Sequence, residues 1–223
     1  MRSMARVIRK HFLLLLLVLC LAQPAPAAHE SGSVGPYNIS FDMNTTMDYR
    51  VIVEPSSKGQ TSLGVDFVRY NMTIDSDNYA AWIVLTRYDE PMVANVTANE
   101  YIVYSALIDS GADRPNLYQV QIDGQPAVVG NFRYEKQFLG EGRYQEGDLV
   151  VAAAYSPDAR LYEDGSYWGK NDCRVISTYP WEIIRDLLHT LHVQLPEEYR
   201  APISSSPSAL NHSNPINHSS EMI

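Results

Sequence analysis

Two segments of the chain alternate strictly between apolar and polar residues, and this period of two constrains the fold more than any other feature. The apolar set is Tyr37, Ile39, Phe41 and Met43 in residues 37–43, and Val68, Tyr70, Met72 and Ile74 in residues 68–75. Successive side chains of a strand point to opposite faces of a sheet. Each segment is therefore predicted to be a strand with one buried face and one face in water.

Further strand and turn signals extend this pattern into an antiparallel meander. Strands are predicted at 37–43, 48–53, 63–75 and 79–88, with turns at 55–59 and 75–78 between them. Asp123-Gly124 is the two-residue signal of a type I′ hairpin, and it joins an alternating segment that ends at Ile122 to a strand within 125–134. Later strands are predicted at 148–155 and 173–178.

Two amphipathic segments predict the helices. Thr97 and Glu100 form a capping-box pattern at the start of the first helix, and Gly111 is placed to end it. The second helix is predicted from about Pro180 to His192, with an apolar stripe made of Ile183, Ile184, Leu187, Leu188 and Leu191. We expect an α+β fold, with an antiparallel β-sheet packed with two main helices in a single domain over 37–196.

The first 27 residues predict export. Four basic residues precede an apolar run at 12–21, and Ala25-Pro26-Ala27 follows, the order typical of a cleaved signal peptide. The run is shorter than the roughly 20 residues that span a bilayer, which favours a cleaved signal over a retained anchor. The retained anchor is one alternative, and a lipid attached at Cys20 is another. We expect an extracellular or cell-surface protein that meets the membrane only during export, with a flexible lead-in at 28–36 and a disordered tail at 197–223.

Charge and cysteine content narrow the class of protein further. Loss of residues 1–27 removes four basic residues and no acidic one, which takes the formal charge from −9 to −13. Such a charge argues against nucleic acid or an anionic membrane as the partner, because both would be repelled. Cys173 is then the single remaining cysteine, buried or paired between chains, so a packed core rather than an intrachain disulfide has to stabilise the domain.

Six of the twelve asparagines lie in N-glycosylation sequons, which favours a glycosylated surface. Two of them fall on the polar faces of the alternating strands, where a sugar would fit. The alternative is that these residues are polar strand residues and nothing more. The predicted acceptors are Asn38, Asn44, Asn71, Asn95, Asn211 and Asn217.

One short motif suggests catalysis. Residues 106–113 resemble the aspartic-protease signature in which Asp109 would share a proton with a symmetry mate and activate water. The apolar-apolar-glycine segment at 128–130 follows too closely to leave room for the intervening strands of that fold. A helix end at Asp109 is the competing interpretation, and a secreted aspartic-type hydrolase is the alternative function.

Other candidate sites are binding sites. His189 and His192 lie three residues apart on the last predicted helix, but two exposed ligands make a weak metal site, so no metal or cofactor is expected. The predicted loop at 156–172 carries aromatic and acidic residues that suit a sugar, a cation or a protein partner, and packing of these rings over a sheet edge is the alternative. Its candidate ligand-binding residues are Tyr162, Asp164, Tyr167 and Trp168.

The order of these elements resembles the PsbP-like family over about 37–193. The resemblance includes an opening meander, a middle helix, a hairpin, and a strand that leads into the Pro180-Trp181 helix, and its most specific string is Ile122-Asp123-Gly124-Gln125-Pro126-Ala127. It implies a PsbP-like sandwich in small extracytoplasmic or accessory proteins that bind partners and carry out no reaction. We therefore expect a secreted, glycosylated binding module, not an enzyme, whose partner is an unidentified protein or carbohydrate.

Overall fold

The computed structural model describes residues 27–134 and 149–196, which fold as α+β with mostly antiparallel strands and two helices. This confirms the predicted class. The predicted leader up to residue 26 and the predicted tail from 197 lie outside the described residues. The elements are β1 (Ala28–Val34), β2 (Tyr37–Met43), β3 (Arg50–Val53), β4 (Ser57–Gln60), β5 (Asp66–Asp75), β6 (Ala80–Val93), α2 (Val96–Asp109), β7 (Asn116–Ile122), β8 (Gln125–Arg133), β9 (Leu149–Tyr155), β10 (Arg160–Leu161), β11 (Tyr167–Ser177), α3 (Trp181–Thr190) and β12 (His192–Gln194).

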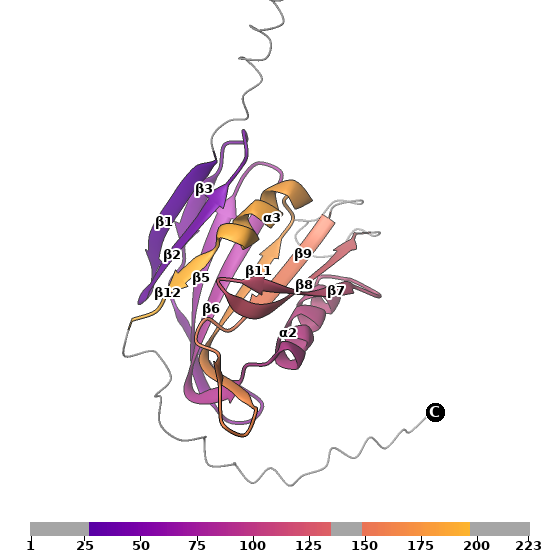
Figure 1. Cartoon of the computed structure of the whole chain (residues 1–223). Coiled ribbons are helices and arrows are strands. Elements are labelled where there is room, and N and C mark those ends of the chain that lie inside the picture. Colours follow the sequence, from indigo (N-terminus) through magenta and orange to yellow (C-terminus); the bar gives the residue numbers. More distant parts are fainter. Residues whose placement is uncertain (1–26, 135–148, 197–223) are drawn as a thin grey trace, which may run out of the picture.

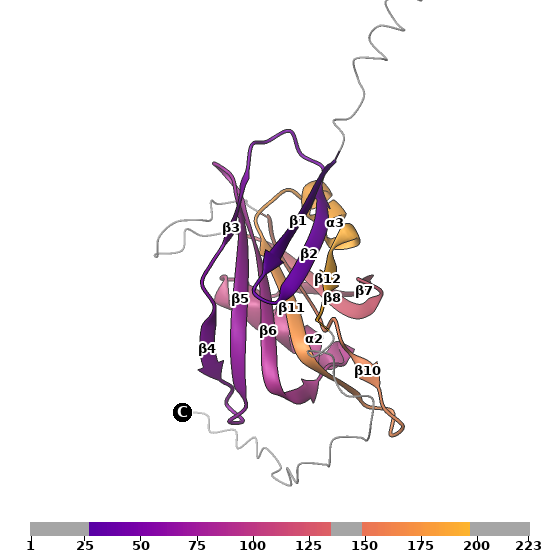
Figure 2. The ribbon, with the colours of Figure 1, turned by 90° about the vertical axis from the view of Figure 1, so that its left-hand side faces the viewer.

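The strands form two antiparallel sheets of unequal size (Figure 1). The large sheet has nine strands, seven of them in the order β3-β5-β6-β11-β9-β8-β7, while β4 pairs with β5 and β10 with β11. The small sheet has the order β1-β2-β12. Figure 2 shows the small sheet and α3 lying across one face of the large sheet, so the fold has a layered arrangement.

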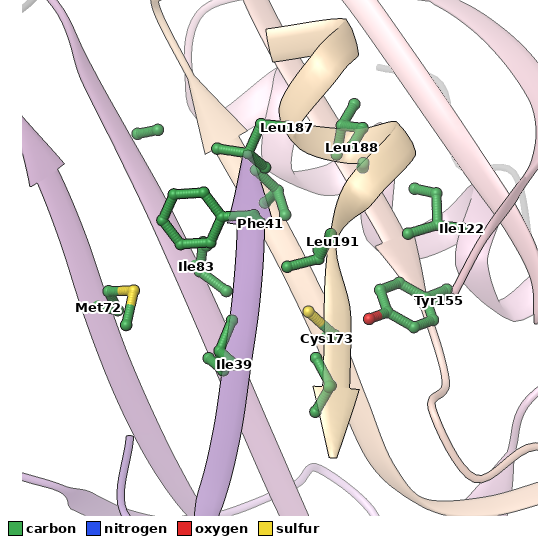
Figure 3. Close-up of a cluster of buried hydrophobic side chains, with 14 of the residues drawn as sticks. Ile39, Phe41, Met72, Ile83, Ile122, Tyr155, Cys173, Leu187, Leu188 and Leu191 are labelled. Atoms are coloured by element: carbon green, nitrogen blue, oxygen red, sulfur yellow. The ribbon is translucent and has the colours of Figure 1, made fainter. Parts of the chain in front are cut away.

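The main core fills the space between these two layers. Phe41 of β2 and Leu187 of α3 meet Ile83 of β6, and each of the three side chains is at most 1% exposed (Figure 3). The alternation predicted for 37–43 is confirmed, because its four apolar residues are buried while Asn38 is exposed. Burial of such side chains contributes about 1.5–3 kcal/mol each, so this layer accounts for much of the stability of a domain without disulfides.

A second, smaller core lies on the opposite face of the large sheet, under α2. Val103 and Leu107 of α2 are buried against Val128 of β8 and Ala152 of β9. Gly130 of β8 lies directly beneath them, and a Cβ atom there would come within 2.6 Å of Leu107 Cδ1. The glycine allows this helix to pack closely on the sheet.

The ends of α2 agree with the sequence in part. Its C-terminus follows the prediction: Gly111 adopts φ +101°, and its amide donates to the Ile108 carbonyl oxygen at 2.9 Å. Its N-terminus corrects the predicted capping box. Asn95 is the N-cap, and its side chain accepts a hydrogen bond from the Ala98 amide at 2.9 Å, so the helix begins one residue before Thr97.

Three strands occupy segments that the sequence analysis assigned otherwise. The predicted flexible lead-in at 28–36 contains β1, which pairs along its whole length with β2. The turn predicted at 55–59 contains the start of β4. The last helix ends at Thr190, and β12 follows where the prediction extended the helix to His192. Each of these strands is stabilised by ladder hydrogen bonds to a partner strand, which is the next strand in the chain for β1 and β4 and the distant β2 for β12.

The predicted loop at 156–172 is also corrected. Within it, β10 pairs with the start of β11, so most of the segment is a hairpin that extends from the large sheet. The hairpin tip contains Gly165 at φ +81°. In the part of the chain that the structure describes, no helix is long and apolar enough to cross a membrane.

Candidate functional site

A polar pocket of about 460 Å³ lies where the β7–β8 turn, the segment after β9 and strand β12 meet. Figure 2 shows β12 above β10, on the side of the molecule where these segments converge. This volume lies in the usual range for small-molecule sites. The lining residues are Asp123, Gln125, Pro157, Asp158, Ala159, Arg160, His192, Val193, Gln194 and Leu195.

A carboxylate and an imidazole pair at the pocket wall. Asp123 Oδ1 lies 2.6 Å from His192 Nδ1, and Asp123 Oδ2 accepts a hydrogen bond from the Val193 amide at 3.0 Å. Asp123 is the first residue of a type I′ turn, since it has φ +54° and Gly124 has φ +71°. The predicted hairpin signal is confirmed, and its aspartate also holds β12 in place. The His192 side chain is 61% exposed while that of Asp123 is 14% exposed, so the imidazole is the more accessible member.

Asp158 is a buried carboxylate with a structural role. It accepts hydrogen bonds from the Lys170 amide at 2.9 Å, the Asn171 amide at 3.0 Å and Asn171 Nδ2 at 3.0 Å. Burial raises the pKa of Asp158, and these hydrogen bonds oppose the rise. Because its oxygens are engaged by the backbone of β11, Asp158 fixes the turn that carries Arg160 rather than presenting a free charge to the pocket.

Arg160 is the cation of this pocket. It is half-buried, and within residues 27–134 and 149–196 its guanidinium makes no hydrogen bond or ion pair. A guanidinium presents five N–H donors in a planar fork. These donors of Arg160 therefore have no acceptor in the part of the chain that the structure describes.

The core next to the Asp123 carboxylate contains Tyr155 and Cys173, which face each other in Figure 3. Cys173 is fully buried, which was one of the two predictions for it, the other being a disulfide between chains. Burial raises the pKa of the Cys173 thiol, and burial together with the nearby Cys173 and Asp123 raises the pKa of Tyr155. Neither group is ionised at neutral pH, so this layer supplies no nucleophile to the pocket.

The four ligand-binding residues predicted from the sequence lie on the hairpin instead of in the pocket. Asp164 accepts hydrogen bonds from the Ser166 hydroxyl and from the Ser166 amide, the latter at 2.9 Å. The hydroxyl bond, followed by the amide bond, lowers the pKa of Asp164. Trp168 Nε1 donates to Ser166 Oγ at 2.8 Å. Tyr162 and Tyr167, like Trp168, are half-buried. Several of the predicted groups are thus used to shape the hairpin tip.

The other candidate residues are dispersed over the fold. Asp109 is the last residue of α2, whereas the catalytic aspartate of the protease motif would follow a strand. His189 lies exposed on α3. Among the described residues, no group of three or more histidine, cysteine, aspartate or glutamate side chains could hold a metal ion.

The four sequons inside the described residues differ in exposure. Asn38 and Asn44 are exposed, and Asn71 is half-buried with its Nδ2 3.4 Å from Glu54 Oε2. Asn95 is the N-cap of α2. Asn211 and Asn217 lie outside the described residues. Exposure favours glycan attachment at Asn38 and Asn44, of which Asn44 also has its Nδ2 3.5 Å from Asp186 Oδ2.

Sequence reasoning did not identify the pocket. From the sequence, Asp123 was interpreted as a turn residue and His192 as one of two histidines in a weak metal site. Arg160 was given no role. The three residues come from segments separated by more than thirty positions. The pairing of β8 with β9 brings the turn of Asp123 near the segment of Arg160, and the pairing of β12 with β2 adds His192. No protein-family model, curated protein or solved structure matches the chain.

Proposed function

We propose that the protein is a secreted or cell-surface binding module, N-glycosylated and without enzymatic activity. The observation that carries this proposal is the polar pocket of about 460 Å³, in which Arg160 has no partner among the described residues. The predicted leader and the sequons support an extracellular setting, in which protein and carbohydrate partners are met. In this proposal the ligand binds in the pocket, and the aromatic residues of the hairpin do not contact it.

We further propose a PsbP-like sandwich for the fold. The element order over 37–193, the antiparallel large sheet and the two helices are consistent with it, and the string at Ile122–Ala127 forms the turn beside the pocket. Because the resemblance implies accessory proteins that bind partners, it is consistent with a binding role for this protein. Because one fold serves many functions, the pocket and not the fold supports the proposal.

The groups around the pocket do not favour the alternative of a hydrolase. The Asp123–His192 pair resembles part of a catalytic triad, but a nucleophile is required beside the imidazole. Among the described residues nearby, Cys173 is fully buried, and Ser156 Oγ donates to the Asn171 carbonyl oxygen at 2.5 Å. Asp109 lies at a helix end on a different part of the fold.

Intact-mass measurement of the natively expressed protein tests the extracellular half of the proposal. We expect the mass to show loss of about 27 residues and the addition of glycans, with one glycan fewer in Asn38→Gln. The unmodified asparagine Asn131, which is not in a sequon, serves as the control in Asn131→Gln. A full-length, unglycosylated protein from its native host would contradict this half.

Ligand screening tests the binding half. The purified protein is exposed to an array of neutral and acidic oligosaccharides and of peptides, and bound probes are followed by their effect on the thermal midpoint. A probe at about 100 times its Kd stabilises the folded state by about 2.7 kcal/mol. We expect Gln194→Ala, in the pocket, to weaken binding and Trp168→Ala, on the hairpin, to leave it unchanged. Loss of binding in Trp168→Ala alone, or turnover of a bound probe, would refute the proposal.

A further inference from the structure

We infer that the pocket binds a carboxylate-bearing sugar, a unit of the uronic acid type, and that the Arg160 guanidinium pairs with its carboxylate. This inference rests on the proposed binding function and names the ligand chemistry of the same pocket. It depends on which polar groups of the lining are already engaged and which are not.

The two carboxylates of the lining are engaged by the protein. Asp123 pairs with His192 through one oxygen and with the Val193 amide through the other. Asp158 accepts three hydrogen bonds from Lys170 and Asn171. A cationic ligand would therefore find few free acceptors here.

Unlike the two carboxylates, the Arg160 guanidinium of the lining is not engaged by the described residues. The Arg160 guanidinium makes no side-chain interaction among the described residues, and it is the one cationic side chain besides His192 in the lining. A planar guanidinium binds a carboxylate through two parallel hydrogen bonds, a geometry that a single point charge does not provide. The free charge of the pocket thus matches an anion with two oxygens in one plane.

His192 supplies a second polar contact. Because its Nδ1 is paired with Asp123, the Nε2 atom is left for a ligand. With Nδ1 donating to the carboxylate, Nε2 of the neutral ring accepts a hydrogen bond from a hydroxyl, and in the protonated ring it donates to an anion. Both partners occur on an acidic sugar.

The rest of the lining fits hydroxyl groups better than an apolar side chain. Gln125 and Gln194 add amide donors and acceptors, while Pro157 and Ala159 give small apolar contacts of the kind that the C–H groups of a sugar ring use. Val193 and Leu195 are themselves buried, at 4% and 7% exposure, and leave no deep apolar recess. A peptide C-terminus would place its last side chain against this polar wall, so we favour the acidic sugar.

Long-range attraction cannot produce this binding. The formal charge is −9 and becomes −13 without residues 1–27, so the protein as a whole repels anions. Affinity for an anionic sugar has to come from the local groups of the pocket, which makes substitution of one cation informative.

The experiment measures the affinity of the intact, natively expressed protein for three probes by titration calorimetry. The probes are a galacturonic acid trisaccharide, its fully methyl-esterified form, and a tripeptide with a free C-terminal carboxylate. Esterification removes the charge and keeps the hydroxyls, and the tripeptide keeps the carboxylate and lacks the sugar. We expect the acidic trisaccharide to bind at least about ten-fold more tightly than either of the other probes.

Variants assign the effect to the guanidinium. Arg160→Gln is expected to lower affinity for the acidic trisaccharide by about ten- to a hundred-fold, and Arg160→Lys to recover only part of the loss. Lys58→Gln, which removes an exposed cation on β4, is the matched control and should bind as the parent does. Thermal midpoints within a few degrees of the parent show that the variants are folded.

Each other outcome overturns the inference in its own way. Equal affinity for the ester and the acid, or unchanged affinity in Arg160→Gln, would show that Arg160 does not pair with a ligand carboxylate. The proposed binding function would still be tested by the ligand screen described above. Tighter binding of the tripeptide would replace the sugar by a peptide. Failure of all three probes to bind would reject the ligand class, and the proposed function is then judged by the wider array.

Discussion

Replacement of Gly130 by alanine tests how closely α2 packs on the large sheet. Gly130 is buried in β8, and a Cβ atom placed there would lie 2.6 Å from Leu107 Cδ1, 2.6 Å from Leu117 Cδ2 and 2.8 Å from Val103 Cγ1. All three distances are shorter than real Cβ contacts, so at least one neighbour has to move. The two leucine atoms are ends of flexible side chains, but Val103 is stiff at χ1 within a helix.

The magnitude follows from two opposing contributions. Adding a methylene-sized group to a packed core costs about 1–3 kcal/mol. Replacing glycine by alanine restricts the unfolded chain, which contributes about 0.4–1 kcal/mol of stability. We expect Gly130→Ala to lower the free energy of unfolding by about 1–2 kcal/mol, which corresponds to a thermal midpoint lower by about 2–8 °C in a domain of this size.

Chemical denaturation followed by circular dichroism measures this loss, with Gly32→Ala as the control. Gly32 also lies in a strand, but a Cβ atom there meets only Met72 Cε at 4.0 Å, so the variant should be as stable as the parent or slightly more stable. Val103→Ala combined with Gly130→Ala should show coupling, because the first change makes room for the second. Equal stability of Gly130→Ala and Gly32→Ala would refute the close packing of α2.

Three further predictions concern other local interactions. Asn95→Ala should cost about 1 kcal/mol and Thr97→Ala much less, because Asn95 caps α2; equal losses in denaturant titrations would restore the capping box. Tyr37→Phe should cost about 1–2 kcal/mol, because the Tyr37 hydroxyl donates to Asn171 Oδ1 at 2.6 Å in a buried site; an unchanged denaturation midpoint would show that this bond contributes nothing. Burial raises the pKa of Asp158 from 3.8, so the folded protein holds this proton to higher pH than the unfolded chain, and the stability due to Asp158 falls as pH rises above 3.8. Asp158→Asn should therefore flatten the pH dependence of unfolding above about pH 4, and a parallel profile would contradict the raised pKa.

The parts of the fold that follow from local sequence were predictable. The alternation of 37–43 gave β2 with its bounds, because burial of one face forces a period of two. Asp123-Gly124 predicted a type I′ turn, since both residues need a positive φ that few other pairs adopt. Gly111 predicted the end of α2 for the same reason. These signals act within a few residues and need no knowledge of the rest of the chain.

The strands that were not predicted depend on their pairing partners, which are adjacent in the chain for β1 and β10 and distant for β12. β1 contains two serines and a glycine and shows no apolar stripe, yet it is held by β2. β12 has three residues and exists because β2 offers a free edge at Ser40. The hairpin at β10 and β11 was predicted as a loop because its aromatic and acidic residues do not alternate cleanly. In all three cases the pairing partner, not the segment itself, determines the structure.

The same dependence explains why the pocket was missed while its key residue was noticed. As a turn residue, Asp123 is interchangeable with asparagine, because both tolerate a positive φ. Asparagine could not replace Asp123 as the acceptor for both His192 and the Val193 amide. The two interactions use both carboxylate oxygens, and an asparagine side chain offers a single oxygen acceptor. The choice of aspartate at this turn is thus explained by β12, seventy residues later in the chain. A turn signal records only the local requirement, so the second requirement becomes visible when the sheet brings the two segments together.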